Sequence, residues 1–274
     1  RRERRRRKKG SVISLSSLFP WLLGTSLIVG IAVFMIIKPP AVDPKTFCDE
    51  KGNIPGVTVI LVDVSDKLSF SQKARLNNEL KNISETSLKR TNAILNKGEK
   101  LVVYFLEQEG IRPFSIFSMC HPGDSNKRSL TEYLFEGDRF AKKKWEMFSS
   151  DTINKIENKI DLTSELSTSP IIETIQYIRS KEFPPPDLIT EKNNYRLIIW
   201  SDMIQNSRIS NHFNRLDDVE VFFKENPFYL NDIKVTVFQV RSKKYKQYQS
   251  NEQFMWWRKM FSISQGELVL WEPL

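Results

Sequence analysis

The chain has 274 residues, of which 40% are hydrophobic and 11% aromatic, so it is long enough and apolar enough to bury a core. Its formal net charge is +9, but residues 1–9 alone contain eight basic side chains and one acidic side chain. The rest of the chain is therefore close to neutral. The excess of basic residues lies in the N-terminal tail, so the net charge gives no support to a nucleic-acid-binding function of the rest of the chain.

An uncharged apolar run follows the basic tail. Residues 18–37 read LFPWLLGTSLIVGIAVFMII, and a run of this length matches the hydrocarbon thickness of a bilayer. The basic residues before it predict a cytoplasmic N-terminus and an exported, periplasmic or otherwise extracytoplasmic, C-terminal part. A cleaved signal peptide is the alternative. We favour a retained anchor, because the run exceeds a signal-peptide core and no small-residue cleavage site follows.

Four regions follow from this pattern. Residues 1–17 form a basic cytoplasmic tail, and residues 18–37 form a transmembrane helix. Residues 38–54 form a proline-containing juxtamembrane tether. Residues 55–274 have the length and composition of a single folded domain.

The exported region alternates between strand-like and helix-like patterns. Six strand-like runs lie at 57–62, 101–106, 113–119, 197–200, 233–240 and 267–271. Apolar stripes at helical spacing lie within 76–83, 153–160, 171–178 and 254–261. This alternation predicts an α/β fold with a mostly parallel sheet covered on both faces. The aromatic stripe of residues 254–261 is more typical of packing onto a sheet than of a partner surface.

One connection differs from the others. Only residues 107–112 separate the second and third strand-like runs, which is too short for a crossover helix. The third strand is therefore predicted to be antiparallel, at an edge of the sheet.

Oxygen-bearing side chains follow two of the predicted central strands and open one helix. Asp63 and Ser65 follow the first strand, Ser169 precedes Pro170 at a predicted helix start, and Asp202 follows the fourth strand. Ligands of open α/β sheets bind outside the carboxyl ends of strands, where the strand order reverses. Oxygen ligands from separate loops suit a hard cation such as Mg²⁺.

These strands, the hairpin and the Asp-x-Ser of residues 63–65 resemble a von Willebrand factor A (vWA) domain over roughly residues 55–274. The resemblance implies a vWA-like (Rossmann-like) three-layer sandwich with one antiparallel edge strand. It also implies a metal-ion-dependent adhesion site (MIDAS). That site would use Asp63, Ser65, Ser169 and Asp202 to hold Mg²⁺, which an acidic side chain of a protein partner would complete. Ser69 and Thr168 are further candidates for the ligand set.

The chain departs from the family pattern at three positions. Lys67 stands where the pattern has a third hydroxyl, Ser169 replaces a threonine, and Met203 replaces the glycine after the last aspartate. The Lys67 ammonium would repel a divalent cation or replace its charge, which makes Lys67 and its neighbour Asp66 candidate partner-binding residues.

The same residues have structural explanations. Ser69 and Gln72 fit a helix capping box. Ser169 fits an N-cap with Pro170 in the first helical position. Asp63 and Asp202 fit the role of loop caps.

This topology predicts the positions of the two cysteines. Cys48 precedes the first strand and Cys120 follows the antiparallel strand, so both belong at the bottom of the sheet, opposite the proposed metal site. An oxidising compartment permits a structural Cys48–Cys120 disulfide. Two free buried thiols are the alternative.

Three functions compete. The first is a membrane-anchored protein-binding domain, and the second is a structural scaffold of an envelope complex. The third, a Mg²⁺-dependent hydrolase using Asp63, Asp66 and Asp202, lacks an evident general base and a phosphate-binding glycine loop. His121 and His212 lack zinc-ligand spacing. We therefore expect no enzyme activity and no small-molecule substrate.

Overall fold

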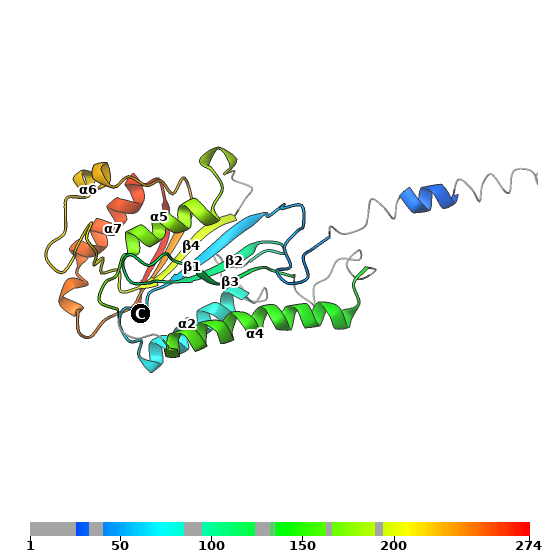
Figure 1. Ribbon diagram of the computed structural model, residues 1–274, viewed down its shortest axis with the longest axis horizontal. Helices are drawn as coiled ribbons and strands as arrows, with labels where there is room; N and C mark the ends of the chain where they lie inside the picture. Colours follow the sequence, from blue (N-terminus) through cyan, green and yellow to red (C-terminus); the bar gives the residue numbers. More distant parts are fainter. Residues whose placement is uncertain are drawn as a thin grey trace, which may run out of the picture.

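The computed structural model describes residues 26–32, 41–84, 95–123, 133, 135–162, 166–189 and 194–274. Its centre is a six-stranded sheet in the order β3-β2-β1-β4-β5-β6 (Figure 1). The strands are β1 (Gly56–Val62), β2 (Lys100–Phe105), β3 (Ser115–Cys120), β4 (Asn194–Ser201), β5 (Lys234–Gln239) and β6 (Glu267–Pro273). The observed strands overlap all six predicted runs, with ends that differ by up to three residues.

Five strands are parallel and one is antiparallel, as predicted. β1 pairs in parallel with both β2 and β4, and β5 joins β4 to β6 in the same direction. β3 pairs antiparallel with β2, with Leu101 opposite Met119. The short hairpin loop leaves no room for a crossover, so β3 has to reverse direction. This sheet fits the vWA-like fold that the sequence indicates.

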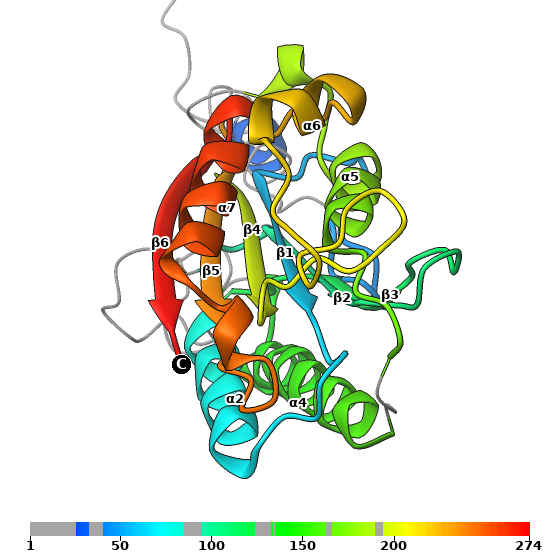
Figure 2. The same cartoon turned by 90° about the vertical axis from the view of Figure 1, so that its left-hand side faces the viewer.

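Helices cover both faces of the sheet (Figure 2). They are α2 (Phe70–Ser84), α4 (Asp138–Leu162), α5 (Ile171–Glu182), α6 (Val219–Glu225) and α7 (Asn251–Ile263), with short 3-10 turns η1 (Pro186–Leu188) and η2 (Lys246–Tyr248). Side chains of β1 alternate between the layers, as the period of a strand requires. Val59 and Leu61 pack with α5, α6 and α7, whereas Ile60 and Val62 pack with α2 and α4.

The aromatic helix α7 packs onto the sheet as expected. Trp257, Met260 and Phe261 are fully buried in the core on that face. Phe254 packs edge-on against Trp271 of β6, with ring centroids 5.1 Å apart. Burial of such large apolar side chains stabilises a fold by about 2–3 kcal/mol each, so these aromatic residues hold α7 to the sheet.

The segment before β1 is tied to the bottom of the sheet. Cys48 and Cys120 form a disulfide with a Cα–Cα distance of 4.9 Å, which confirms the predicted bond. The Cys120 amide also donates to the Thr46 carbonyl at 2.7 Å. The two cysteines are the only ones in the chain, so the bond accounts for both thiols.

The proposed membrane span lies mostly outside the described residues. Of residues 18–37, only 26–32 are described, and they form a short helix. Within the part of the chain that the structure covers, no helix is long and apolar enough to cross a bilayer. The basic tail, residues 1–17, also lies outside the described residues.

Candidate functional site

The candidate site lies at the carboxyl ends of β1 and β4, the two central strands. From β1 the chain proceeds outward through β2 and β3, and it then returns to place β4 on the other side of β1. The strand order therefore reverses between the paired strands β1 and β4 (Figure 2). Asp63 follows β1 and Asp202 follows β4, and the Asp63 amide donates to the Trp200 carbonyl at 2.7 Å.

The Asp63 carboxylate accepts hydrogen bonds from residues of the three predicted loops. Its Oδ1 accepts the Ser65 amide at 2.9 Å. Its Oδ2 accepts the Ser201 hydroxyl at 2.6 Å and the Ser169 hydroxyl at 3.2 Å. Only 4% of Asp63 is exposed. The three predicted loops therefore meet at this one side chain.

Asp202 is as buried but has fewer donors. It is 7% exposed, and its Oδ1 accepts the Ile204 amide at 2.8 Å. No described residue donates a hydrogen bond to its second oxygen. That oxygen is consequently available to a ligand.

The pKa values of both carboxylates are raised. Burial raises the pKa of Asp63, and the hydrogen bonds from Ser201, Ser65 and Ser169 offset only part of that rise. Burial raises the pKa of Asp202 well above its ordinary value, and the nearby charge of Asp63 adds to the rise. No Lys, Arg or His of the described chain forms an ion pair with either group. A proton or a bound cation is needed to neutralise this buried charge.

Met203 shapes the loop after β4. Its φ is +62°, in the left-handed region that glycine enters most easily. Here the Met203 carbonyl accepts the Gln253 side-chain amide at 2.8 Å and the Trp257 indole N–H at 2.7 Å, and its amide donates to Ser201 Oγ at 2.8 Å. These contacts from α7 and β4 hold a conformation that methionine alone disfavours.

Ser169 does not cap α5. The N-cap residue is Pro170, without a side-chain cap, and the Ser169 hydroxyl is directed to Asp63 instead. Gln205 takes over the capping function, because its Oε1 accepts the Ile172 amide at 3.0 Å. The Ser169 amide and carbonyl both pair with Asn206, so the loop after β4 fixes the position of Ser169. The N-cap explanation of Ser169 is therefore wrong.

The remaining candidates point elsewhere. Ser69 is exposed and forms the reciprocal capping box with Gln72 that starts α2. The Thr168 hydroxyl accepts the Glu109 amide in the β2–β3 hairpin loop at 2.8 Å. Lys67 is exposed and forms no ion pair with Asp63 or Asp202. Asp66 accepts the Ser242 hydroxyl at 2.7 Å, which links the loops after β1 and β5.

The residues at this edge fit a hard cation in part. Two buried carboxylates and the hydroxyls around Asp63 are the oxygen donors that Mg²⁺ uses. In the part of the chain that the structure describes, this edge included, no three His, Cys, Asp or Glu side chains are grouped to hold a metal. The vWA pattern has a hydroxyl where this chain has Lys67, so one hydroxyl is missing from the site. The Ser201 hydroxyl is an additional one. Sequence reasoning did not assign Ser201 a role, although its place beside Asp202 at the end of β4 was visible.

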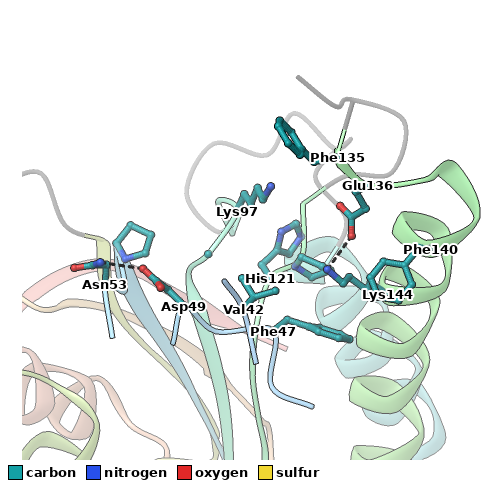
Figure 3. Close-up of a pocket in the computed structure, with 13 residues that line it drawn as sticks. Val42, Phe47, Asp49, Asn53, Lys97, His121, Phe135, Glu136, Phe140 and Lys144 are labelled. Atoms are coloured by element: carbon teal, nitrogen blue, oxygen red, sulfur yellow. Dashed lines mark hydrogen bonds and ion pairs between the residues drawn. The ribbon is translucent and has the colours of Figure 1, made fainter. Parts of the chain in front are cut away.

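A cavity of about 570 Å³ lies at the opposite end of the sheet (Figure 3). Its walls include Phe47, Lys97 and His121, together with the start of α4. Among the charged groups at its wall, Lys144 pairs with Glu136 at 2.8 Å, and Asp49 accepts a hydrogen bond from the Asn53 side-chain amide at 2.9 Å.

Comparison with known proteins gave matches among solved structures only. No family model matches it, and no curated protein sequence matches it. The conserved hypothetical protein BatB from Bacteroides thetaiotaomicron is similar, with a TM-score of 0.40 and 9% identity over 80% of this chain and 91% of that chain. Human COPII-coat protein Sec24c gives a TM-score of 0.36 and 7% identity over 81% of this chain and 30% of that chain.

A mussel protein is also similar. Proximal thread matrix protein 1 from the mussel byssus gives a TM-score of 0.34 and 11% identity over 77% of this chain. The match spans 47% of the mussel chain, so less than half of that protein is involved. Another structure of the mussel protein has a zinc-occupied MIDAS motif.

Proposed function

We propose that this chain is a membrane-anchored, vWA-like protein-binding domain and not an enzyme. Residues 18–37 would anchor it, with a cytoplasmic N-terminus and an exported domain. Asp63, Ser65, Ser169 and Asp202 would hold Mg²⁺, and an acidic side chain of a partner protein would complete its coordination. Ser201 joins this group through its bond to Asp63.

One observation carries the proposal. Asp63 and Asp202 are buried at the reversal point of the sheet, their pKa values are raised, and no cationic side chain of the described residues compensates them. Buried structural carboxylates are normally paired, because an isolated buried charge is costly. An uncompensated pair in this position is typical of a site that binds a cation.

Calorimetric titration of the full chain with Mg²⁺ tests the metal site directly. We expect one-site binding in the wild type and none in Asp202→Asn. Asparagine preserves the shape of the side chain and its acceptor for the Ile204 amide, so this variant should fold. Lys234→Gln, an exposed change at the other end of β5, is the matched control. Equal Mg²⁺ binding in the wild type and Asp202→Asn would refute the site.

A specific observation favours a second function, a metal-free structural scaffold. Protein donors reach both oxygens of Asp63, from Ser65, Ser169 and Ser201, so this carboxylate holds three loops together without a metal. The transmembrane segment and basic tail would then make the partner contacts. In a metal-free form of the protein-binding function, Lys67 would instead meet a partner carboxylate directly. Normal assembly in the Asp63→Ala/Asp202→Ala variant would favour the scaffold. Unchanged partner affinity in Lys67→Ala would exclude the direct role of Lys67.

A further inference from the structure

The loop between β5 and α7 brings a group of cations to the same edge of the sheet as the candidate site. It follows the carboxyl end of β5, which pairs with β4. Arg241, Lys243 and Lys246 are exposed in this loop, and none of them has an ion-pair partner among the described residues. Because β4 and β5 are parallel neighbours, these cations and Asp202 belong to one face of the molecule.

Side-chain hydrogen bonds fix the loop onto the candidate site. Ser242 is buried and donates to Asp66 at 2.7 Å, so its neighbours on either side face outward. The Gln249 side-chain amide donates to the carbonyls of Val240 at 2.7 Å and Asp202 at 3.2 Å. These bonds fix the backbone that carries the cations relative to both aspartate-bearing loops.

The start of α2 extends this surface. Gln72 donates from its side chain to the Arg241 carbonyl at 3.0 Å, which places the first turn of α2 against the loop. Phe70, in the same turn, is 88% exposed. Lys67, three residues earlier, is also exposed. We call Lys67, Phe70, Arg241, Lys243 and Lys246 the cationic surface.

An aromatic cluster supports the loop from behind. Phe213 packs against Tyr245 and Tyr248, with ring centroids 4.8 and 4.9 Å apart. The Lys244 ammonium lies 4.7 Å from the centroid of the Tyr245 ring. Rigid supports of this kind lower the entropy lost when a partner binds. An exposed Phe among fixed cations is also the composition of an interface anchor.

We propose that the cationic surface binds an acidic polypeptide segment that carries an apolar side chain. The proposal rests on the proposed function, since it places the partner at the same edge. Cations beside Asp63 and Asp202 would attract the flanking carboxylates of the partner while its apolar side chain covers Phe70. A phosphate backbone suits this edge less well, because its charges are continuous, whereas a polypeptide can place neutral residues opposite Asp66 and the site carboxylates. A lipid surface is also disfavoured, because the edge lies about 20 Å, the length of β1, from the tether end of the sheet.

Fluorescence anisotropy with a labelled peptide tests the proposal on the full chain. The probe is a short Asp/Glu-rich peptide with one central leucine, in the presence of Mg²⁺. Compared with it are the same peptide in Asn/Gln form, an oligothymidylate of equal charge, and phosphatidylglycerol vesicles. The key variant is Arg241→Glu/Lys243→Glu/Lys246→Glu. The matched control, Lys45→Glu/Lys51→Glu/Lys234→Glu, changes the charge equally with exposed residues at the other end. The basic tail is identical in both variants.

We expect the key variant to bind the acidic peptide about tenfold more weakly than the control variant does, with a reduced dependence on salt. Phe70→Ala should weaken binding of the leucine peptide more than that of a leucine-free one. Equal affinity of the two triple variants for the peptide would overturn the inference. So would a larger loss of oligothymidylate or vesicle binding than of peptide binding in the key variant, measured against the control variant.

The two proposals fail separately. Loss of peptide binding in Asp202→Asn or with chelator, with normal binding in the key variant, would overturn this inference and support the metal site. Loss of binding in the key variant only would support the inference and refute capture of the peptide through a metal.

Discussion

The two ends of the sheet differ in whether a cation compensates their buried carboxylates. At the amino end, Glu99 is fully buried and is compensated by Arg196 at 3.2 Å and by the side-chain amides of Asn96 and Asn194 at 2.8 and 2.6 Å. At the carboxyl end, Asp63 and Asp202 are as buried and have hydroxyl and amide donors but no cation. A buried charge is tolerated when it is paired. The amino end therefore has the chemistry of a structural network, whereas the carboxyl end holds buried carboxylates without a compensating cation among the described residues.

Removing the disulfide should have the largest effect on stability, and it acts at the structural end. Cys48 and Cys120 are 72 residues apart in sequence, so their bond restricts the unfolded chain strongly. We expect Cys48→Ser/Cys120→Ser to lower the free energy of unfolding by about 4 kcal/mol, measured by urea denaturation. Calorimetric Mg²⁺ binding by the folded variant should be unchanged. A loss of Mg²⁺ binding in the folded variant would contradict the independence of the two ends.

Breaking the compensated pair should be nearly as severe. In Arg196→Met the Glu99 carboxylate stays buried and loses its cation, which should lower the free energy of unfolding by about 3 kcal/mol. Adding Glu99→Gln should recover part of the loss, because the uncompensated charge is then gone. An Arg196→Met protein with wild-type stability in urea would show that the network is not structural.

His212 adds a pH dependence near the carboxyl end. It is 5% exposed between Trp256 and Trp257, and its amide donates to the Gln205 carbonyl. Burial lowers the pKa of its ring to about 4, although Asp217 and the Met203 carbonyl oppose the shift.

Because the pKa of His212 is lower in the folded protein than in the unfolded chain, the unfolded chain takes up a proton on His212 first as the pH falls. Stability should decrease from about pH 6.5 to pH 4, by about 2–3 kcal/mol in total. His212→Phe should flatten the urea midpoint over this window. An unchanged slope in His212→Phe would exclude His212 as its cause.

The sequence was sufficient for most of the fold because the central strands are nearly continuous apolar runs. β1 is buried at every position. Only six residues separate the second and third strand-like runs of the sequence, which permits only a hairpin. The same reasoning paired Cys48 with Cys120, since the strand directions bring both to one end. Helix α6 was not predicted, because seven residues give too short a period to recognise.

The site was predictable in location but less so in its contacts. Asp63, Ser169 and Asp202 follow from strand ends and a Ser-Pro helix start. The roles of Ser201 and Gln205 depend on side-chain directions in the loop after β4, which no periodicity encodes. The backbone conformation of Met203 is also not predictable from the local sequence. Its left-handed backbone is set by Gln253 and Trp257, which are distant in sequence.

Asp202→Asn should have the smallest effect and is the sharpest test of the comparison. The raised pKa of Asp202 means that its ionisation opposes folding as the pH rises above about 3.8, its unfolded value. In chelator at pH 7, the variant should therefore be more stable than the wild type, by about 1 kcal/mol. Below about pH 3.8 the difference should disappear, because Asp202 is then mostly protonated in both the folded and the unfolded wild type. Added Mg²⁺ should raise the thermal midpoint of the wild type only, and less so at low pH, where protons compete for the carboxylates. If Asp202→Asn instead lost stability in chelator at pH 7, as Arg196→Met should, the carboxyl end would be a second structural network, and the contrast between the two ends would disappear.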